Sequence, residues 1–177
     1  ERRGSHQVKV VEKPEVRKAG GVYYTPTYIV DYIVQQTVGR LLEGRTPAEA
    51  SILKILDPAC GSGSFLLGAY QYLLDWHLRW YLADGAQKHT AGKSASLRPA
   101  DRAGGESSDG QRWALTTRAR KAILLNNLHG VDIDYQAVEV TKLSLLLKCL
   151  EGETAESINA QLKIFHERAL PDLGRNI

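Results

Sequence analysis

The sequence predicts an α/β fold in which short parallel strands alternate with helices. The run Ile52–Leu56 is short and apolar and stops abruptly at Asp57-Pro58, which is typical of a buried, parallel strand. A second short strand is predicted over 128–133, directly after a helical pattern that runs from near Thr116 to Asn127. Two strands joined by a helical crossover indicate a doubly wound sheet or a piece of one.

Size and composition fit a soluble globular domain. The 177 residues can bury one real core, and 43% are hydrophobic and 24% charged. No apolar run reaches the eighteen or more residues of a membrane span, and the polar start at Glu1–His6 is no secretory signal. We therefore expect a cytoplasmic protein without a membrane partner.

The two cysteines carry no metal or disulfide signal. Cys60 and Cys149 are far apart and form no CxxC pair, which argues against a disulfide framework and a zinc site. We expect Cys60 to be a small buried residue in a turn and Cys149 to pack in the core. No metal ligand is predicted.

The N-terminal third predicts an arm and a helix. Residues 1–21 are polar and lack periodicity, which indicates an arm. Thr25 is the predicted N-cap and Pro26 the first residue of a helix that ends at Glu43-Gly44. Thr46-Pro47 then starts a connection or short turn. The domain proper is expected over 22–177.

The middle and end of the chain contain two more helical patterns. Gly61 and Gly63 form a turn, after which a helix runs to about Leu82. Residues from about 84 to 115 are rich in Gly, Ser, Lys and Arg and are expected to be an inserted surface loop on the crossover. Residues 136–150 form a strongly apolar helix, which we expect to be buried on several sides.

The net charge of +3 is too small to indicate nucleic acid by itself. Basic residues gather in the first eighteen positions and again between 88 and 121. Two interpretations stay open for them: solvated basic loops, or a surface that contacts phosphates.

The glycine turn Asp57–Phe65 is the strongest signal for a ligand. Its glycines let the backbone approach a ligand at the carboxyl end of a strand, where the next helix offers free amides. A P-loop is excluded because no lysine lies near Gly61 or Gly63. A dinucleotide fingerprint would need a small residue at Leu66 and would place Asp57 against a pyrophosphate.

S-adenosylmethionine fits the charges better, because it carries an ammonium, a carboxylate, a sulfonium and a ribose diol but no phosphate. Asp57 can accept from the ammonium, and Thr25 can donate to the methionyl carboxylate. Asp132, at the end of the neighbouring strand, can accept from the ribose hydroxyls, with Ile133 beside it as an apolar face for adenine. In the alternative interpretation Asp57 is an ordinary cap and Asp132 a solvated strand end.

Five segments in order resemble the adenine-N6 DNA methyltransferases, especially those of type IIG restriction–modification enzymes. The resemblance runs from about Arg17 to the end of the chain. The segments are 20–26 before the first helix, 57–65 at the cofactor turn, 130–134 at the ribose-binding strand end, 138–145 in the next helix, and 170–177. It implies a partial Rossmann-like methyltransferase fold that uses S-adenosylmethionine as cofactor.

The resemblance also implies a set of cofactor-binding residues. Thr25 and Asp57 would hold the methionyl group, and Asp132 the ribose, while Asp134 more readily caps the next helix. The expected cofactor-binding residues are Tyr24, Thr25, Pro26, Asp57, Ala59, Cys60, Gly61, Ser62, Gly63, Phe65, Asp132 and Ile133.

Two features depart from the family pattern. The inserted segment separates Gly63 from Asp132 by far more than a compact unit requires. The family's catalytic Pro-Pro-aromatic motif is missing, since none of the six prolines is adjacent to another. We therefore predict no catalytic residue in this chain and no methylation by the chain alone.

Several alternatives remain on sequence grounds. RNA and protein methyltransferases share the same cofactor turn, and a non-catalytic binding module could keep the fold. For the full-length enzyme the expected partner is double-stranded DNA. For the isolated chain, half a sheet predicts an exposed edge and self-association.

Overall fold

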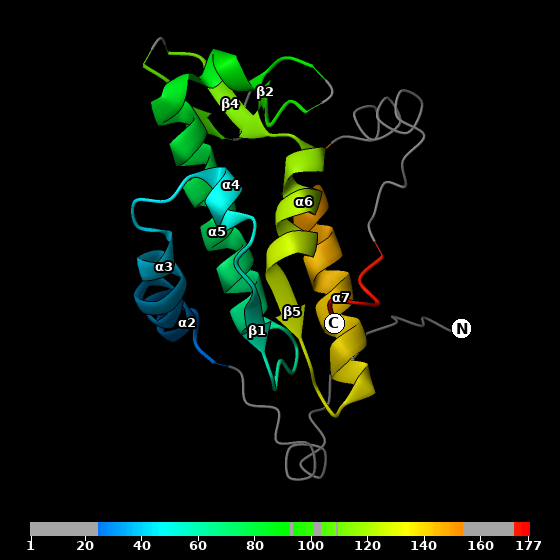
Figure 1. Cartoon of the computed structure of the whole chain (residues 1–177). Coiled ribbons are helices and arrows are strands. Elements are labelled where there is room, and N and C mark those ends of the chain that lie inside the picture. Colours follow the sequence, from blue (N-terminus) through cyan, green and yellow to red (C-terminus); the bar gives the residue numbers. More distant parts are fainter. Residues whose placement is uncertain (1–24, 93, 101–103, 109, 154–171) are drawn as a thin grey trace, which may run out of the picture.

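The computed structural model describes residues 25–92, 94–100, 104–108, 110–153 and 172–177. Helices pack beside a two-stranded parallel sheet, and a small antiparallel sheet lies at the other end of the longest described helix, α5 (Ser64–Gly85) (Figure 1). The predicted α/β architecture with parallel strands is confirmed. Among the described residues, no helix combines the length and the apolarity needed to cross a bilayer.

The first predicted helix is present but is divided into three parts. They are α2 (Thr27–Val34), a π-helical turn η1 (Gln35–Gly39) and α3 (Arg40–Leu42). The prediction that Pro26 is the first helical residue and Thr25 its cap is wrong. Pro26 is itself the N-cap: its ψ of 141° is extended, and its carbonyl accepts from the amides of Ile29 and Val30.

The connection after Gly44 contains a short helix where the sequence predicts a connection or short turn. This helix, α4 (Pro47–Ala50), has a capping box at its N-terminus. The Thr46 hydroxyl accepts from the amide of Glu49, and the Glu49 carboxylate accepts from the Thr46 amide at 2.8 Å. Glu43 ends the preceding helix as predicted.

The first strand is parallel, as predicted, but it is shorter and more exposed. β1 (Ile55–Asp57) pairs with β5 (Leu128–Gly130) in the register Ile55↔Leu128 and Asp57↔Gly130. The prediction of a buried strand is wrong, because the Leu56 side chain is 60% exposed. Successive side chains of a strand point to opposite faces, and the side chain of Leu56 stays largely exposed on its face.

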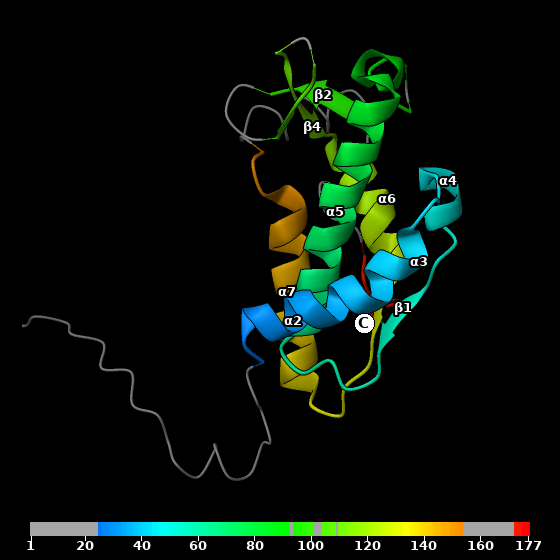
Figure 2. The ribbon, with the colours of Figure 1, turned by 90° about the vertical axis from the view of Figure 1, so that its left-hand side faces the viewer.

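Helix α5 (Ser64–Gly85) is the centre of the molecule and matches the helix predicted after the glycine turn. Its buried residues Leu66, Tyr70 and Leu73 lie in the core. Helix α2 crosses it at close range (Figure 2). A methyl group at Gly68 would lie 2.4 Å from the Val30 side chain, so glycine is what permits this approach.

The segment expected to be a surface loop forms a small sheet instead. A 3-10 turn, η2 (Ala86–His89), is followed by three strands: β2 (Leu97–Pro99), β3 (Gly105–Glu106) and β4 (Arg112–Leu115). Their order is β2-β4-β3, all antiparallel. Leu97, Trp113 and Leu115 are buried, which fixes the sheet on the core. Strands of two to four residues leave too few alternating positions to be recognised in a sequence.

The last two helices were predicted correctly in position. Helix α6 (Thr117–Asn127) begins at the N-cap Thr116, and α7 (Tyr135–Leu150) begins at the N-cap Asp134. The prediction that α7 is buried on several sides is wrong. Thr141, Leu145 and Cys149 are buried where α7 packs against α5, α6 and the glycine turn, but a stripe of apolar side chains stays exposed. This stripe consists of Val140, Leu143 and Leu147.

Candidate functional site

The glycine turn joins the end of β1 to the start of α5, at the carboxyl edge of the parallel sheet. Gly61 (φ 51°) and Gly63 (φ 85°) both adopt the left-handed conformation that other residues rarely take. The amide of Gly63 donates to the carbonyl of Cys60 at 2.8 Å and closes the turn. Gly63 is also the N-cap of α5, so the first amides of this helix face the edge of the sheet.

The structure brings Asp57 and Asp132 to the same edge. The amide of Val131 donates to the Asp57 carbonyl, and the amide of Cys60 donates to the Val131 carbonyl, both at 2.9 Å. These bonds continue the β1–β5 ladder beyond the strands and carry the chain directly to Asp132. Asp57 and Asp132 therefore lie at the adjacent ends of two paired parallel strands.

The Asp132 carboxylate is bonded to the turn itself. Its Oδ2 accepts from the amide of Gly61 at 2.7 Å, and its Oδ1 accepts from the amide of Asp134 at 2.8 Å. Two hydrogen bonds lower the pKa of Asp132 below its usual range: the one from the amide of Asp134 has the larger effect, and the one from the amide of Gly61 adds to it. Asp132 is thus an anion at neutral pH.

Asp134 has a different task, as the sequence indicated. Its Oδ1 accepts from the amides of Gln136 at 2.9 Å and Ala137 at 3.4 Å, which caps α7. Asp57 makes a local turn of its own, since its Oδ1 accepts from the amide of Ala59 at 3.1 Å.

Sequence reasoning missed Thr141. Its side chain is fully buried, and its hydroxyl donates to the carbonyl of Gly61 at 2.8 Å. Thr141 lies within a segment already noted for its family resemblance, but nothing in the local pattern of an apolar helix marks one threonine as a contact of a turn eighty positions earlier.

Gly130 is a second position that the pattern did not explain. A methyl group there would lie 2.7 Å from Cδ1 of Leu66 and 3.1 Å from Sγ of Cys60. Glycine at the end of β5 therefore lets the strand, the turn and α5 come together. A strand-end glycine could have been noticed in the sequence, but its neighbours could not.

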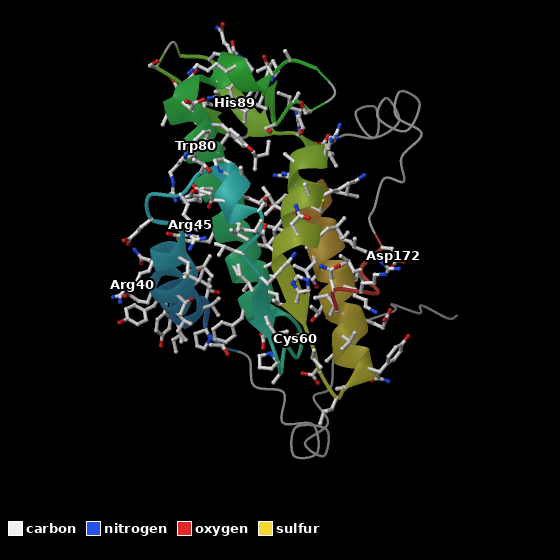
Figure 3. The ribbon with its side chains drawn as sticks, in the orientation of Figure 1. Arg40, Arg45, Cys60, Trp80, His89 and Asp172 are labelled. Atoms are coloured by element: carbon white, nitrogen blue, oxygen red, sulfur yellow. The ribbon has the colours of Figure 1, made fainter. Side chains whose placement is uncertain are left out.

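The remaining predicted residues are distributed around the turn. Cys60, at the foot of β1 in Figure 3, is 5% exposed, and burial raises the pKa of its thiol. Its side chain therefore faces the core, while Ile133 lies wholly exposed beyond β5. Ser62 is half-buried within the turn.

A cavity of about 300 Å³ opens beside β1 and borders one of the two carboxylates. Asp57 and Phe65 line it, together with apolar side chains of α2, η1 and α5, whereas Asp132 and Ile133 do not. Thr25 and Pro26 immediately precede α2, and among the described residues no hydrogen bond joins them to the turn. Tyr24 lies outside the described residues.

Comparison with known proteins identifies the family. Residues 44–171 match the model of the MmeI DNA-methyltransferase domain. This chain belongs to that family. The family match covers the glycine turn, the Asp132 strand end and helix α7, whereas Tyr24, Thr25 and Pro26 lie before it.

Curated relatives agree with this assignment. The chain is 31% identical over 156 residues to the type II restriction enzyme and methyltransferase RM.Eco57I of Escherichia coli, which spans 88% of this chain and 14% of that protein. It is 26% identical over 147 residues to the adenine-specific methyltransferase PglX of Streptomyces coelicolor, spanning 83% of this chain and 9% of PglX. The resemblance to adenine methyltransferases of restriction–modification systems is confirmed. The chain spans only a small part of the length of these relatives.

Proposed function

We propose that this MmeI-type chain is the S-adenosylmethionine-binding portion of a site-specific DNA adenine-N6 methyltransferase, within a restriction–modification enzyme. The observation that carries the proposal is the placement of Asp57 and Asp132 at adjacent parallel strand ends, on either side of a glycine turn. A Rossmann-like sheet, of which β1 and β5 are two strands, is part of the proposal. So is the division into an arm over 1–21 and a methyltransferase domain over 22–177.

The described residues fit this cofactor. Around Gly61, the space that a side chain would occupy is empty to at least 4 Å, which leaves room for a ligand against the backbone. The edge offers carboxylates for an ammonium and a ribose diol, amides at the start of α5 for a carboxylate, and the exposed Ile133 for an apolar ring. An anionic Asp132 next to this turn would repel a pyrophosphate instead.

Each residue then has a defined task. Asp132 accepts from the ribose hydroxyls with the lone pairs that Gly61 and Asp134 leave free, and Asp57 accepts from the methionyl ammonium. The backbone over 59–63 lies against the cofactor, and Thr25, just before α2, donates to the methionyl carboxylate. The bound cofactor supplies a methyl group on a cationic sulfur. The chain's own residues bind and orient it.

Transfer to adenine needs residues that this sequence lacks. The Pro-Pro-aromatic motif that would hold the exocyclic amine is missing among its six prolines. In the complete enzyme the target base leaves the double helix to reach the cofactor, and DNA is the macromolecular partner. The chain by itself is expected to transfer no methyl group to DNA, which a tritium incorporation assay against a protein-free control tests.

Titration calorimetry with S-adenosylmethionine tests the cofactor site. We expect Asp132→Ala to weaken binding by roughly tenfold or more, because a charge-assisted contact is lost. Asp75→Ala is the matched control, since Asp75 is an exposed carboxylate on α5 remote from the turn. Equal affinities of the wild type and Asp132→Ala would remove Asp132 from the site.

A cofactor analogue without the ribose 2′-hydroxyl separates the ribose contact from the role of Asp132 in the turn. The wild type should bind this analogue more weakly than the cofactor. Asp132→Ala should bind both equally, because the acceptor is gone. An undiminished preference for the hydroxyl in the variant would place the ribose elsewhere.

A further inference from the structure

In the glycine turn, Gly61 has both its amide and its carbonyl hydrogen-bonded to side chains. Asp132 accepts from its amide at 2.7 Å, and Thr141 donates to its carbonyl at 2.8 Å. The two side chains come from different elements, the end of β5 and the middle of α7. The orientation of the peptides on either side of Gly61 is therefore fixed from outside the turn.

Thr141 also fills the space behind the turn. It is fully buried, and a methyl group at Gly63 would lie 2.8 Å from both its Oγ1 and its Cγ2. The hydroxyl thus sets the direction of the Gly61 carbonyl. The Thr141 side chain also limits how closely the backbone at Gly63 can approach α7. One residue of α7 determines both the orientation and the depth of the loop.

The direction of the Gly61 carbonyl matters for a ligand. A peptide that flips here would turn the Gly61 amide away from Asp132 or aim a carbonyl dipole into the space that a ligand occupies. The Asp132 carboxylate would then lose a donor that holds it in place. Thr141 prevents this without facing the ligand itself, because its side chain has no exposed surface.

We propose that Thr141 is a positioning residue for the cofactor turn: its hydroxyl holds the Gly61 peptide so that Asp132 and the backbone over 59–63 are pre-set to receive S-adenosylmethionine. This proposal rests on the proposed function. It predicts that removing the hydroxyl weakens cofactor binding and loosens the backbone of the turn.

The decisive variants separate the hydroxyl from the volume of the side chain. Thr141→Val keeps the shape and loses the donor, whereas Thr141→Ser keeps the donor and loses a methyl group. In the intact protein we expect Thr141→Val to raise the Kd for S-adenosylmethionine roughly tenfold. Thr141→Ser should stay within about threefold of the wild type.

A buried threonine elsewhere supplies the control. The Thr117 hydroxyl donates to Oε1 of Glu153 at 2.7 Å, between α6 and the end of α7. Thr117→Val should lower the melting temperature and leave the Kd for the cofactor unchanged. Hydrogen exchange at the amides of 61–63 should become faster in Thr141→Val and stay as in the wild type in Thr117→Val.

The outcomes distinguish this proposal from the function on which it rests. If the wild type binds S-adenosylmethionine and Asp132→Ala does not, but Thr141→Val binds as the wild type does, the role of Thr141 is refuted and the function stands. If the wild type itself does not bind, the function fails. Should Thr141→Val not fold, Thr141→Ser and Thr141→Ala decide, since equal affinities of these two would refute a role of the hydroxyl.

Discussion

Arg98 and Glu153 join the inserted sheet to the end of helix α7. Nη2 of Arg98 lies 3.1 Å from Oε1 of Glu153, and the Glu153 side chain is only 1% exposed. Arg120, on α6, donates to the carbonyls of Cys149 and Glu151 next to it. The insertion therefore braces α7, in the sense that an ion pair from β2 holds the end of this helix in place. Helix α7 carries Thr141 and is capped by Asp134.

The first prediction concerns this brace. Arg98→Ala leaves a buried carboxylate with fewer donors and should cost about 1–3 kcal/mol of unfolding free energy, measured by urea denaturation. Arg112→Ala is the matched control in the same small sheet, because its partner Glu106 lies 4.0 Å away and both side chains are more than half exposed. The control should cost less than about 0.5 kcal/mol. Equal losses in the two variants would show that the insertion does not brace α7.

The second prediction concerns acid sensitivity. His77 is 3% exposed, its Nδ1 lies 2.7 Å from the Leu73 carbonyl, and burial lowers the pKa of its imidazole. The unfolded chain therefore binds a proton that the folded chain does not, so stability is lost as the pH falls below about 6.5. His77→Gln should make the melting temperature less dependent on pH between about 7.5 and 5.5. An unchanged pH dependence would contradict the assignment.

The sequence predicted those parts of the fold that depend on local patterns. The helix that starts near Thr116, the cap Asp134, the glycine turn and both parallel strands follow from residues a few positions apart. The contacts that complete the site do not. Asp132 and Thr141 bond to Gly61 across 71 and 80 positions, and no spacing rule connects them. The small antiparallel sheet was not predicted for a different reason: its strands are too short to show an alternating pattern in the sequence.

Burial was the property that the sequence predicted least well. Leu56 and the exposed stripe of α7 look like core residues because they are apolar and regularly spaced. Whether such a residue is covered depends on neighbouring elements, and the described elements cover only one side of the sheet and of α7. Periodicity identifies an element and its apolar face, but it cannot supply the surface against which that face packs.

The third prediction concerns Gly130. Gly130→Ala places a methyl group 2.7 Å from Cδ1 of Leu66, a core residue that is 1% exposed, so the leucine or the turn must shift. We expect a loss of about 1–3 kcal/mol in stability and weaker cofactor binding, because the turn must move away from β5. Adding Leu66→Val removes the atom that clashes, so the double variant should be more stable than the sum of the single effects predicts. Strict additivity would contradict this contact.

The fourth prediction concerns the exposed stripe of α7. Val140, Leu143 and Leu147 are 51%, 58% and 62% exposed and follow one another at spacings of three and four, so they form one apolar face. A face of this kind favours association, and we expect the isolated chain to form dimers or larger species in sedimentation velocity at micromolar concentrations. Leu143→Gln with Leu147→Gln should shift it toward the monomer. Leu41→Gln, at a leucine of α3 that is 50% exposed, should not. If Leu41→Gln also shifts the chain toward the monomer, association is nonspecific and does not use this face.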